Sequence, residues 1–181
     1  MYGLELLDNP MTEQPKQKKQ QTTDPIQIGL VENDPDYHRR IESELNSLDD
    51  PYKLRIWNSA ESFWRDAAAR KLDLLLLDIK LPGMDGVELA GRVAERDEHI
   101  RIVMLSNMNS DRLIFQALRN GAVGYILKSE LNDIPATVRT IMDGGAIITP
   151  TIAYRVMSSF KKTNPVMGAG LTEREKQVLE L

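Results

Sequence analysis

The sequence of 181 residues contains no cysteine. Without thiols the chain can form neither disulfide bonds nor thiolate metal sites, and this composition fits a reducing compartment. No segment approaches the ~20 consecutive apolar residues that a helix needs to cross a bilayer. The N-terminus also lacks a basic region followed by a long apolar run, so we expect no secretory signal, no membrane contact and a cytoplasmic location.

The sequence has no excess of positive charge either. Its formal net charge is −4, and this mild acidity argues against strong nonspecific binding of nucleic acid by this chain. With 41% hydrophobic and 28% charged residues, the composition predicts one soluble globular domain with appendages, or one domain and a fragment of a second. The chain is long enough to bury a substantial core.

The most apolar stretch is a run of four leucines, Leu74–Leu77, which leads directly into Asp78. Turn residues follow at Pro82–Gly86. A continuous apolar run bounded by turn signals is typical of a strand that is buried on both faces. Because ligands bind at the carboxyl ends of strands in open parallel sheets, Asp78 is the first candidate for a functional residue.

Similar patterns predict five strands, each followed by a helix. The expected strands are 26–31, 52–57, 72–77, 100–105 and 123–127. The expected helices begin near Asp34, Asn58, Gly86, Ser110 and Asn132, and the second of them carries Ala67 to Ala69. This alternation predicts an α/β fold with a doubly wound parallel sheet and right-handed crossovers. Polar residues at the strand ends are then expected to converge on one edge of the sheet: Glu32, Asn33, Asp34, Asp78, Ser106 and Lys128.

The ends of the chain have a different character from the middle. We divide the sequence into a disordered N-terminal tail (1–25), a domain (26–146), a linker with a short helix (147–170) and a final segment (171–181). The tail is polar and aperiodic, so it cannot bury enough surface to become ordered. In the final segment Thr172 and Glu175 form a capping box, which predicts a helix start. We expect this helix to open a C-terminal domain that is truncated here.

A carboxylate at a strand end can bind a hard cation, act as a base or act as a nucleophile. Phosphoryl transfer to Asp78 would need a divalent ion, usually Mg²⁺, together with a cation and a hydroxyl that contact the phosphoryl oxygens. The candidates are Glu32 and Asp34 as metal ligands, the backbone carbonyl of Lys80 as a further ligand, Lys128 as the cation and Ser106 as the hydroxyl. An aspartate with an ordinary pKa of ~3.9 is ionised at neutral pH and needs no activating base.

Residues 26–146 resemble the receiver domain of two-component response regulators. Four motifs carry the resemblance: Leu30–Pro35, Leu77–Gly86, Val103–Ser106 and Gly121–Lys128. It implies a flavodoxin-like (CheY-like) five-stranded sheet in the order 2-1-3-4-5. It also implies that a histidine kinase or phosphotransfer protein phosphorylates Asp78, and that the domain is a regulatory phosphoacceptor rather than an enzyme.

The resemblance further identifies Ser106 and Tyr125 as paired switch residues. Their separation of 19 residues, and the three residues from Tyr125 to Lys128, match the spacing of the family. On phosphorylation the hydroxyl of Ser106 is expected to turn toward the phosphoryl group, while the ring of Tyr125 moves inward.

One position departs from the family pattern. Receivers usually carry two adjacent acidic residues after the first strand, and here these positions are Glu32 and Asn33. The second is commonly a direct Mg²⁺ ligand, so the amide of Asn33 predicts weaker metal binding; Asp34 either compensates or only caps the next helix. The alternative function is therefore a phosphorylation-independent receiver that acts as a protein-interaction module.

Residues after 145 resemble the NarL/LuxR (FixJ) subfamily of these regulators. Gly144–Ala146 and Thr149–Pro150 look like its interdomain region, and Leu171–Glu175 looks like the opening of its DNA-binding helix-turn-helix domain. The resemblance implies a homodimer, through either the fourth helix with the fifth strand and helix or the first and last helices, and DNA binding only through the missing domain. A nucleotide-binding enzyme is disfavoured, because no glycine-rich loop follows the first strand.

Overall fold

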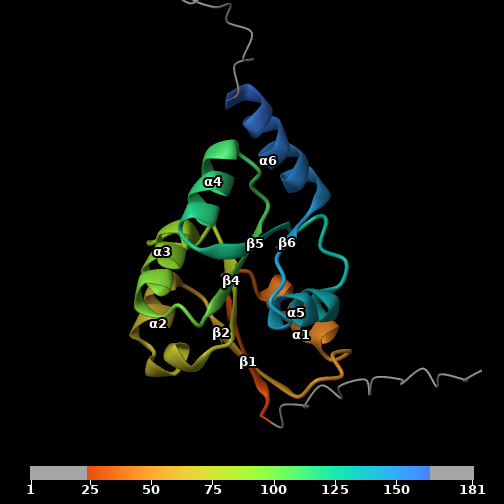
Figure 1. Cartoon of the computed structure of the whole chain (residues 1–181). Helices are drawn as coiled ribbons and strands as arrows, with labels where there is room; N and C mark the ends of the chain where they lie inside the picture. The colour runs from red at the N-terminus through yellow and green to blue at the C-terminus, as the bar shows by residue number, and fades with distance from the viewer. Residues whose placement is uncertain (1–23, 164–181) are drawn as a thin grey trace, which may run out of the picture.

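The computed structural model describes residues 24–163, which form a parallel β-sheet covered by helices on both faces (Figure 1). The elements are β1 (Ile26–Val31), α1 (Pro35–Leu45), β2 (Tyr52–Trp57), α2 (Ala60–Arg65), the 3₁₀ helix η1 (Ala67–Lys71), β3 (Leu74–Asp78), α3 (Gly86–Arg96), β4 (Arg101–Ser106), α4 (Asp111–Arg119), β5 (Ala122–Leu127), α5 (Ile134–Met142), β6 (Ile147–Ile148) and α6 (Pro150–Thr163). Residues 1–23 of the predicted tail, residues 164–170 of the predicted linker and the predicted DNA-binding segment (171–181) lie outside the described residues.

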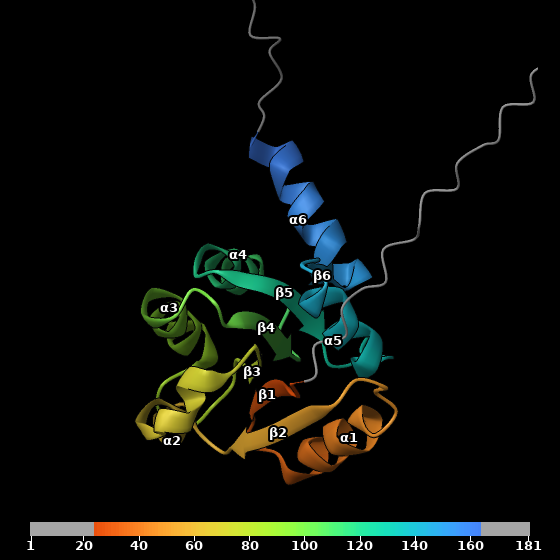
Figure 2. The same cartoon turned by 60° about the horizontal axis from the view of Figure 1, so that its bottom comes forward.

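The four leucines of β3 lie at the centre of the molecule and are fully buried. Leu75 and Leu77 pack into a hydrophobic cluster with α2, α3, α4 and α6, whereas Leu74 and Leu76 pack with α1 and α5. Figure 2 shows the same division, with α2, α3 and α4 on one side of the sheet and α1 and α5 on the other. Each such side chain contributes about 1.5–3 kcal/mol on burial, so the strand that carries Asp78 is firmly held.

The predicted strand order is confirmed, with one addition at the edge. The sheet runs β2-β1-β3-β4-β5-β6, and all of these pairings are parallel. The prediction of five strands was therefore one short, because Ile147 and Ile148 pair with Gly124 and Tyr125. Two residues are too few to show a periodicity; the free edge of β5 supplies the hydrogen-bonding partners that make them a strand.

The helix predicted from residue 58 is also shorter than expected. It ends at Arg65, and Ala67–Lys71 form a separate 3₁₀ helix. Asp66 lies between them with an extended backbone, and its carboxylate accepts a hydrogen bond from the amide of Ala68 at 2.8 Å. An aspartate that bonds the amide two residues further on starts a new turn, which explains the break.

A close backbone contact connects α3 to the end of β3. Gly86 is the first residue of α3, and its amide donates a hydrogen bond to the carbonyl oxygen of Ile79 at 3.0 Å. A Cβ atom at Gly86 would lie 1.9 Å from the carbonyl oxygen of Asp78. No L-side chain fits there without moving the main chain of Asp78, so glycine is required by this contact.

Gly86→Ala is therefore expected to lower the free energy of unfolding by about 1–3 kcal/mol, as an overpacked contact does. Gly91→Ala in the same helix is the matched control, because its Cβ would meet only the side chain of Asn120, at 3.1 Å. The control should change stability by less than about 1 kcal/mol. Urea denaturation measures both, and equal stability of the two variants would contradict the close contact.

Candidate functional site

The carboxyl ends of β1, β3, β4 and β5 bring the candidate side chains to one edge of the sheet. Asp78 and Ser106 are the last residues of β3 and β4, while Glu32 and Lys128 directly follow β1 and β5. The ammonium of Lys128 lies 3.3 Å from Oδ1 of Asp78 and forms an ion pair with Oε2 of Glu32. Glu32 and Asp78 lie 96 and 50 positions before Lys128 in the sequence. The parallel sheet therefore explains their convergence.

Glu32 is the most deeply buried of the three charged residues, with 1% of its side chain exposed. Its Oε1 accepts hydrogen bonds from the amides of Asn33 and Asp34, both at 3.0 Å. Its Oε2 pairs with Lys128. Both carboxylate oxygens of Glu32 are thus engaged within the protein, and they fix the loop that leads into α1.

Asn33 and Asp34 are exposed on that loop. Of the two interpretations of Asp34, the structure shows the helix cap: Oδ1 accepts a hydrogen bond from the amide of Asp36 at 2.9 Å. Pro35 follows as the first residue of α1, where a missing amide hydrogen costs nothing. Lys80 is exposed at the start of the loop between β3 and α3.

Asp78 is 5% exposed and shares a single ammonium with Glu32. Burial raises the pKa of Asp78 above its ordinary value; Lys128 opposes this shift, and the negative charge of Glu32 adds to it. Two carboxylates facing one ammonium leave a formal charge of −1 in a largely dry site. A further cation at this position is therefore electrostatically favoured.

The two expected switch residues are connected through Met108. The backbone amide of Met108 donates to the hydroxyl of Ser106 at 3.0 Å, and the hydroxyl of Tyr125 donates to the Met108 carbonyl at 2.6 Å. Both side chains are fully buried, and burial raises the pKa of Tyr125 to about 12. The ring of Tyr125, which the resemblance expected to move inward on phosphorylation, is already inside in this structure.

Tyr37 is a residue at this site that was not predicted from the sequence. This residue lies in α1, is 8% exposed, and places its ring centroid 4.4 Å from the Lys128 ammonium. Its place in the core could have been found from the helical spacing of Tyr37, Ile41 and Leu45. Its contact with Lys128 could not, because that contact joins residues that are 91 positions apart.

The oxygen atoms at this edge of the sheet are of the kind that a magnesium ion binds. Within residues 24–163 no three side chains of histidine, cysteine, aspartate or glutamate converge in a way that could hold a metal. Mg²⁺, however, commonly binds through one or two carboxylates and completes its shell with water. Asp78 supplies carboxylate oxygens, and Oε2 of Glu32 would become a donor in exchange for its ion pair with Lys128. With the amide oxygen of Asn33 and the carbonyl of Lys80 nearby in sequence, these oxygens fit a magnesium site that contains few charged ligands.

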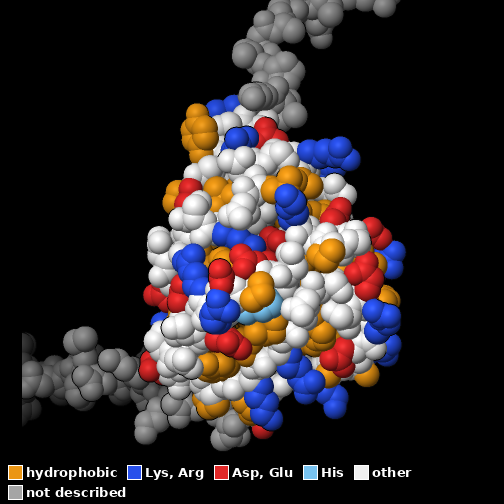
Figure 3. Space-filling model, turned by 180° about the vertical axis from the view of Figure 1, so that it is seen from behind, with side chains coloured by type: hydrophobic (Ala, Val, Ile, Leu, Met, Phe, Trp, Pro, Cys, Tyr) orange, Lys and Arg blue, Asp and Glu red, His pale blue; other side chains and the backbone are white. Residues whose placement is uncertain are grey.

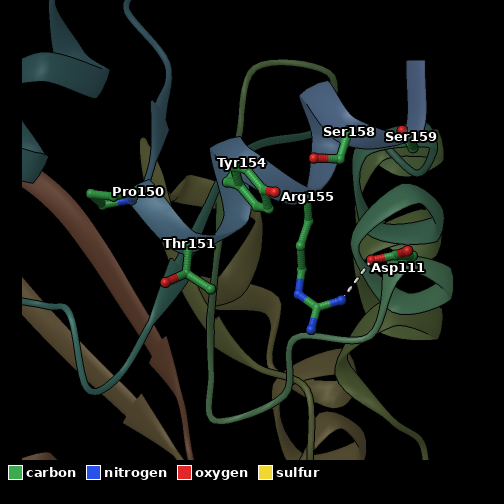
Figure 4. Close-up of a pocket in the computed structure, with 7 residues that line it drawn as sticks. All are labelled: Asp111, Pro150, Thr151, Tyr154, Arg155, Ser158 and Ser159. Carbon is green, nitrogen blue, oxygen red and sulfur yellow. Dashed lines mark hydrogen bonds and ion pairs between the residues drawn. The ribbon is translucent and has the colours of Figure 1, made fainter. Parts of the chain in front are cut away.

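A second feature lies away from this edge, between α4 and α6. A cavity of about 640 Å³ is lined by Asp111, Pro150, Thr151, Tyr154, Arg155, Ser158 and Ser159, none of which is a predicted site residue. Arg155 reaches across to Asp111 at 2.9 Å (Figure 4). Thr151 also bonds Glu130, which lies two residues after Lys128. The first half of α6 is thus tied to the loop after β5 and to the first residue of α4.

The surface shows no strongly basic area on the face drawn in Figure 3, where acidic and basic side chains are interspersed. The large apolar side chains that are most exposed belong to α6: Tyr154, Met157 and Phe160. In the part of the chain that the structure describes, no helix combines the length and the apolar character needed to span a membrane.

Comparison with known proteins gives the family. Residues 28–139 match the model of the response regulator receiver domain. The response regulator protein VraR of Staphylococcus epidermidis is 33% identical over 142 residues, which are 78% of this chain and 68% of VraR. The transcriptional regulatory protein LnrK of Bacillus subtilis is 29% identical over 125 residues, 68% of this chain and 56% of LnrK. The chain thus spans roughly half to two thirds of these relatives.

Solved structures agree at the level of the fold. The isolated receiver domain of RcsB from Salmonella enterica, determined with a phosphomimetic beryllofluoride, has a TM-score of 0.67 at 15% identity and covers 73% of this chain and 99% of its own. A LuxR-family regulator from Aurantimonas has a TM-score of 0.63 at 24% identity, over 75% and 98% of the two chains. The chain therefore belongs to the response regulator receiver family of two-component systems, with NarL/LuxR-type transcription regulators among its relatives.

Proposed function

We propose that Asp78 of this receiver accepts a phosphoryl group from a histidine kinase or phosphotransfer protein. The observation that carries the proposal is the convergence of Asp78, Glu32 and Lys128 at the carboxyl edge of the sheet, with Ser106 on the next strand. No other group of residues in the described part of the chain combines a carboxylate, an ammonium and a hydroxyl at neighbouring strand ends.

Each residue then has a defined part. A carboxylate oxygen of Asp78 attacks the phosphorus atom of the donor phosphohistidine, so that the new O–P bond forms as the P–N bond breaks, and the imidazole of the donor leaves and takes up a proton from water. Lys128 neutralises charge on the phosphoryl oxygens during this transfer. Glu32 holds Lys128 and the loop of Asn33 in place. Mg²⁺, when bound by Asp78 and Glu32, would supply further positive charge to these oxygens.

Release of Ser106 would carry the signal. Its hydroxyl accepts the amide of Met108, so turning this hydroxyl toward a phosphoryl oxygen removes the acceptor from Met108. The carbonyl of Met108 is held by Tyr125. The loop between β4 and α4 is therefore the element we propose to shift on phosphorylation.

A titration with beryllofluoride in the presence of Mg²⁺ tests the proposal. We expect chemical-shift changes at the amides of Asp78, Ser106, Met108 and Lys128 in the wild type, and none in Asp78→Asn. A wild type that shows no response at millimolar Mg²⁺ would exclude phosphoacceptor function.

The second candidate is a receiver that works without phosphorylation. It is favoured by two observations: Lys128 is already paired with Glu32, and an amide, Asn33, stands where the family commonly has a carboxylate ligand. In this case the folded domain would act as a protein-interaction module, and the beryllofluoride titration would be silent.

Asn33→Asp separates a weakened site from a lost one. A new carboxylate on this exposed loop is expected to lower the dissociation constant for Mg²⁺ about tenfold, equivalent to ~1.4 kcal/mol. Asn46→Asp, which adds the same charge at the far end of α1, is the control and should leave the constant unchanged. Calorimetric titration provides the measurement; equal affinities in wild type and Asn33→Asp would remove Asn33 from the metal site.

The remaining parts of the proposal concern the whole protein. We propose that it acts in the cytoplasm as a homodimer and contacts DNA through a domain that begins at residues 171–181. For the dimer, the surface of α4, β5 and α5 and the surface of α1 and α5 remain the two candidates.

A further inference from the structure

The ammonium of Lys128 has three neighbours rather than two. Besides Glu32 and Asp78, the ring of Tyr37 lies 4.4 Å away, measured from its centroid. Only 10% of the Lys128 side chain is exposed. The aromatic ring is thus a third group in contact with a largely buried ammonium. An ammonium over such a face is attracted to it, most strongly when water is excluded.

Tyr37 is fixed in this position by its helix. It lies one turn after the Asp34 cap, and with Ile41 and Leu45 it belongs to the core between α1, α5 and the sheet. Its hydroxyl has no hydrogen-bond partner among the described residues. Hydrogen bonding of the hydroxyl thus does not explain the orientation of the ring, and packing does.

We propose that Tyr37 is a positioning residue for Lys128. Its ring keeps the ammonium beside Asp78. The ring does not compete with Asp78 for the ammonium, as a third carboxylate would. The use of this contact in phosphoryl transfer rests on the proposed function, in which the ammonium that Glu32 holds in this structure would shift toward the phosphoryl oxygens. An aromatic face attracts a cation over a broad area, so the ammonium can shift between these partners while it stays in contact with the ring.

Two substitutions separate the ring from its hydroxyl. Tyr37→Phe keeps the aromatic face and removes only the unpartnered hydroxyl, so it is expected to behave as the wild type. Tyr37→Leu keeps an apolar side chain for the core but removes the face. Tyr154→Leu makes the same change on the exposed surface of α6 and is the control.

The first measurement does not involve phosphorylation. In protein labelled with ¹⁵N-lysine, without Mg²⁺, the rate at which the Lys128 ammonium exchanges protons with water is measured by NMR. We expect this exchange rate to rise about tenfold in Tyr37→Leu, because a desolvated cation–aromatic contact is lost. The rate should change less than twofold in Tyr37→Phe and Tyr154→Leu. Amide spectra confirm folding; if Tyr37→Leu is unfolded, Tyr37→Met replaces it with the same expectations.

The second measurement is the rate of phosphoryl incorporation from acetyl phosphate with Mg²⁺. Tyr37→Leu should be slowed about tenfold and the other two variants less than twofold. Normal ammonium exchange in Tyr37→Leu, or equal losses in Tyr37→Phe and Tyr37→Leu, would overturn the role of the ring. A third outcome is that the exchange rate of the Lys128 ammonium rises only in the variant without the aromatic ring while even the wild type incorporates no phosphoryl group. In that case the positioning role stands and the phosphoacceptor function fails.

Discussion

Lys128→Met is expected to lower the free energy of unfolding by about 3–5 kcal/mol, the range typical of removing one partner from a buried ion pair. Among residues 24–163, Lys128 is the only lysine whose ammonium lies against both Glu32 and Asp78. Methionine preserves much of the apolar stem of the lysine, so the loss of stability comes mainly from removing the positive charge. Without Lys128 two buried carboxylates face each other, which is the costly arrangement.

A double substitution checks this explanation. Lys128→Met combined with Glu32→Gln removes one of the two carboxylates and should recover a large part of the loss. Lys53→Met, at an exposed position in β2, should change stability by less than about 0.5 kcal/mol. Urea denaturation at pH 7 gives these values, and a loss below about 1 kcal/mol for Lys128→Met would show that the pair is well hydrated.

Asp78→Asn is expected to have the opposite effect on stability, a gain on the order of 1–2 kcal/mol at pH 7. Burial is the largest influence on Asp78 and outweighs the attraction of Lys128, so its pKa in the folded protein is raised above the ordinary value of 3.8. The folded state therefore disfavours the charged carboxylate that neutral pH imposes. Asparagine has a similar shape and no charge, and Lys128 keeps Glu32 as its partner.

The pH dependence follows from the direction of this shift. A group whose pKa is raised on folding favours the folded state when it is protonated, and this contribution is lost as the pH rises through the folded pKa. The gain of Asp78→Asn over the wild type should therefore be fully present at neutral pH. It should shrink on acidification through the raised pKa and vanish below about 3.8, the ordinary value.

Unfolding curves of both proteins at several pH values measure this difference directly. Asp36→Asn, on the exposed first turn of α1, is the control and should show no comparable gain. A variant that is less stable than the wild type at pH 7, with a gap that closes on acidification, would mean that Lys128 dominates over burial. The Asp78→Asn variant should also not be phosphorylated. We therefore expect a receiver that is more stable than the wild type and does not respond to beryllofluoride.

The sheet could be predicted because its signals are local. The run Leu74–Leu77 and its turn identify the central strand, and Asp78 follows directly from its position at the end. The position of Lys128 beside Asp78 then follows from the rule that parallel strands end at one edge. By contrast, β6 is too short to carry a pattern, and its formation depends on the free edge of β5.

The convergence of Glu32, Asp78, Ser106 and Lys128 at one edge of the sheet could be predicted, but the contacts among them could not, and their roles in phosphoryl transfer stay predictions. Sequence reasoning could not show that Glu32 takes the Lys128 ammonium, or that Ser106 and Tyr125 both bond to Met108, because these choices depend on rotamers within a packed core. The same holds for Tyr37, whose helical spacing indicates only a buried residue. Such contacts are tertiary and leave no periodic signal in the chain.

The attachment of α6 has a mechanical consequence. Near its start the helix is held by Glu130, beside the loop of Lys128, and by Asp111, at the start of α4 beyond the loop of Met108. Figure 1 shows the rest of the helix projecting away from the sheet. Its 14 residues form a rigid lever of about 21 Å. A tilt of about 10° about Thr151, the first of these anchors, would swing the far end, about 18 Å away, by about 3 Å, so a small rotation at the sheet edge becomes a larger displacement where the chain continues.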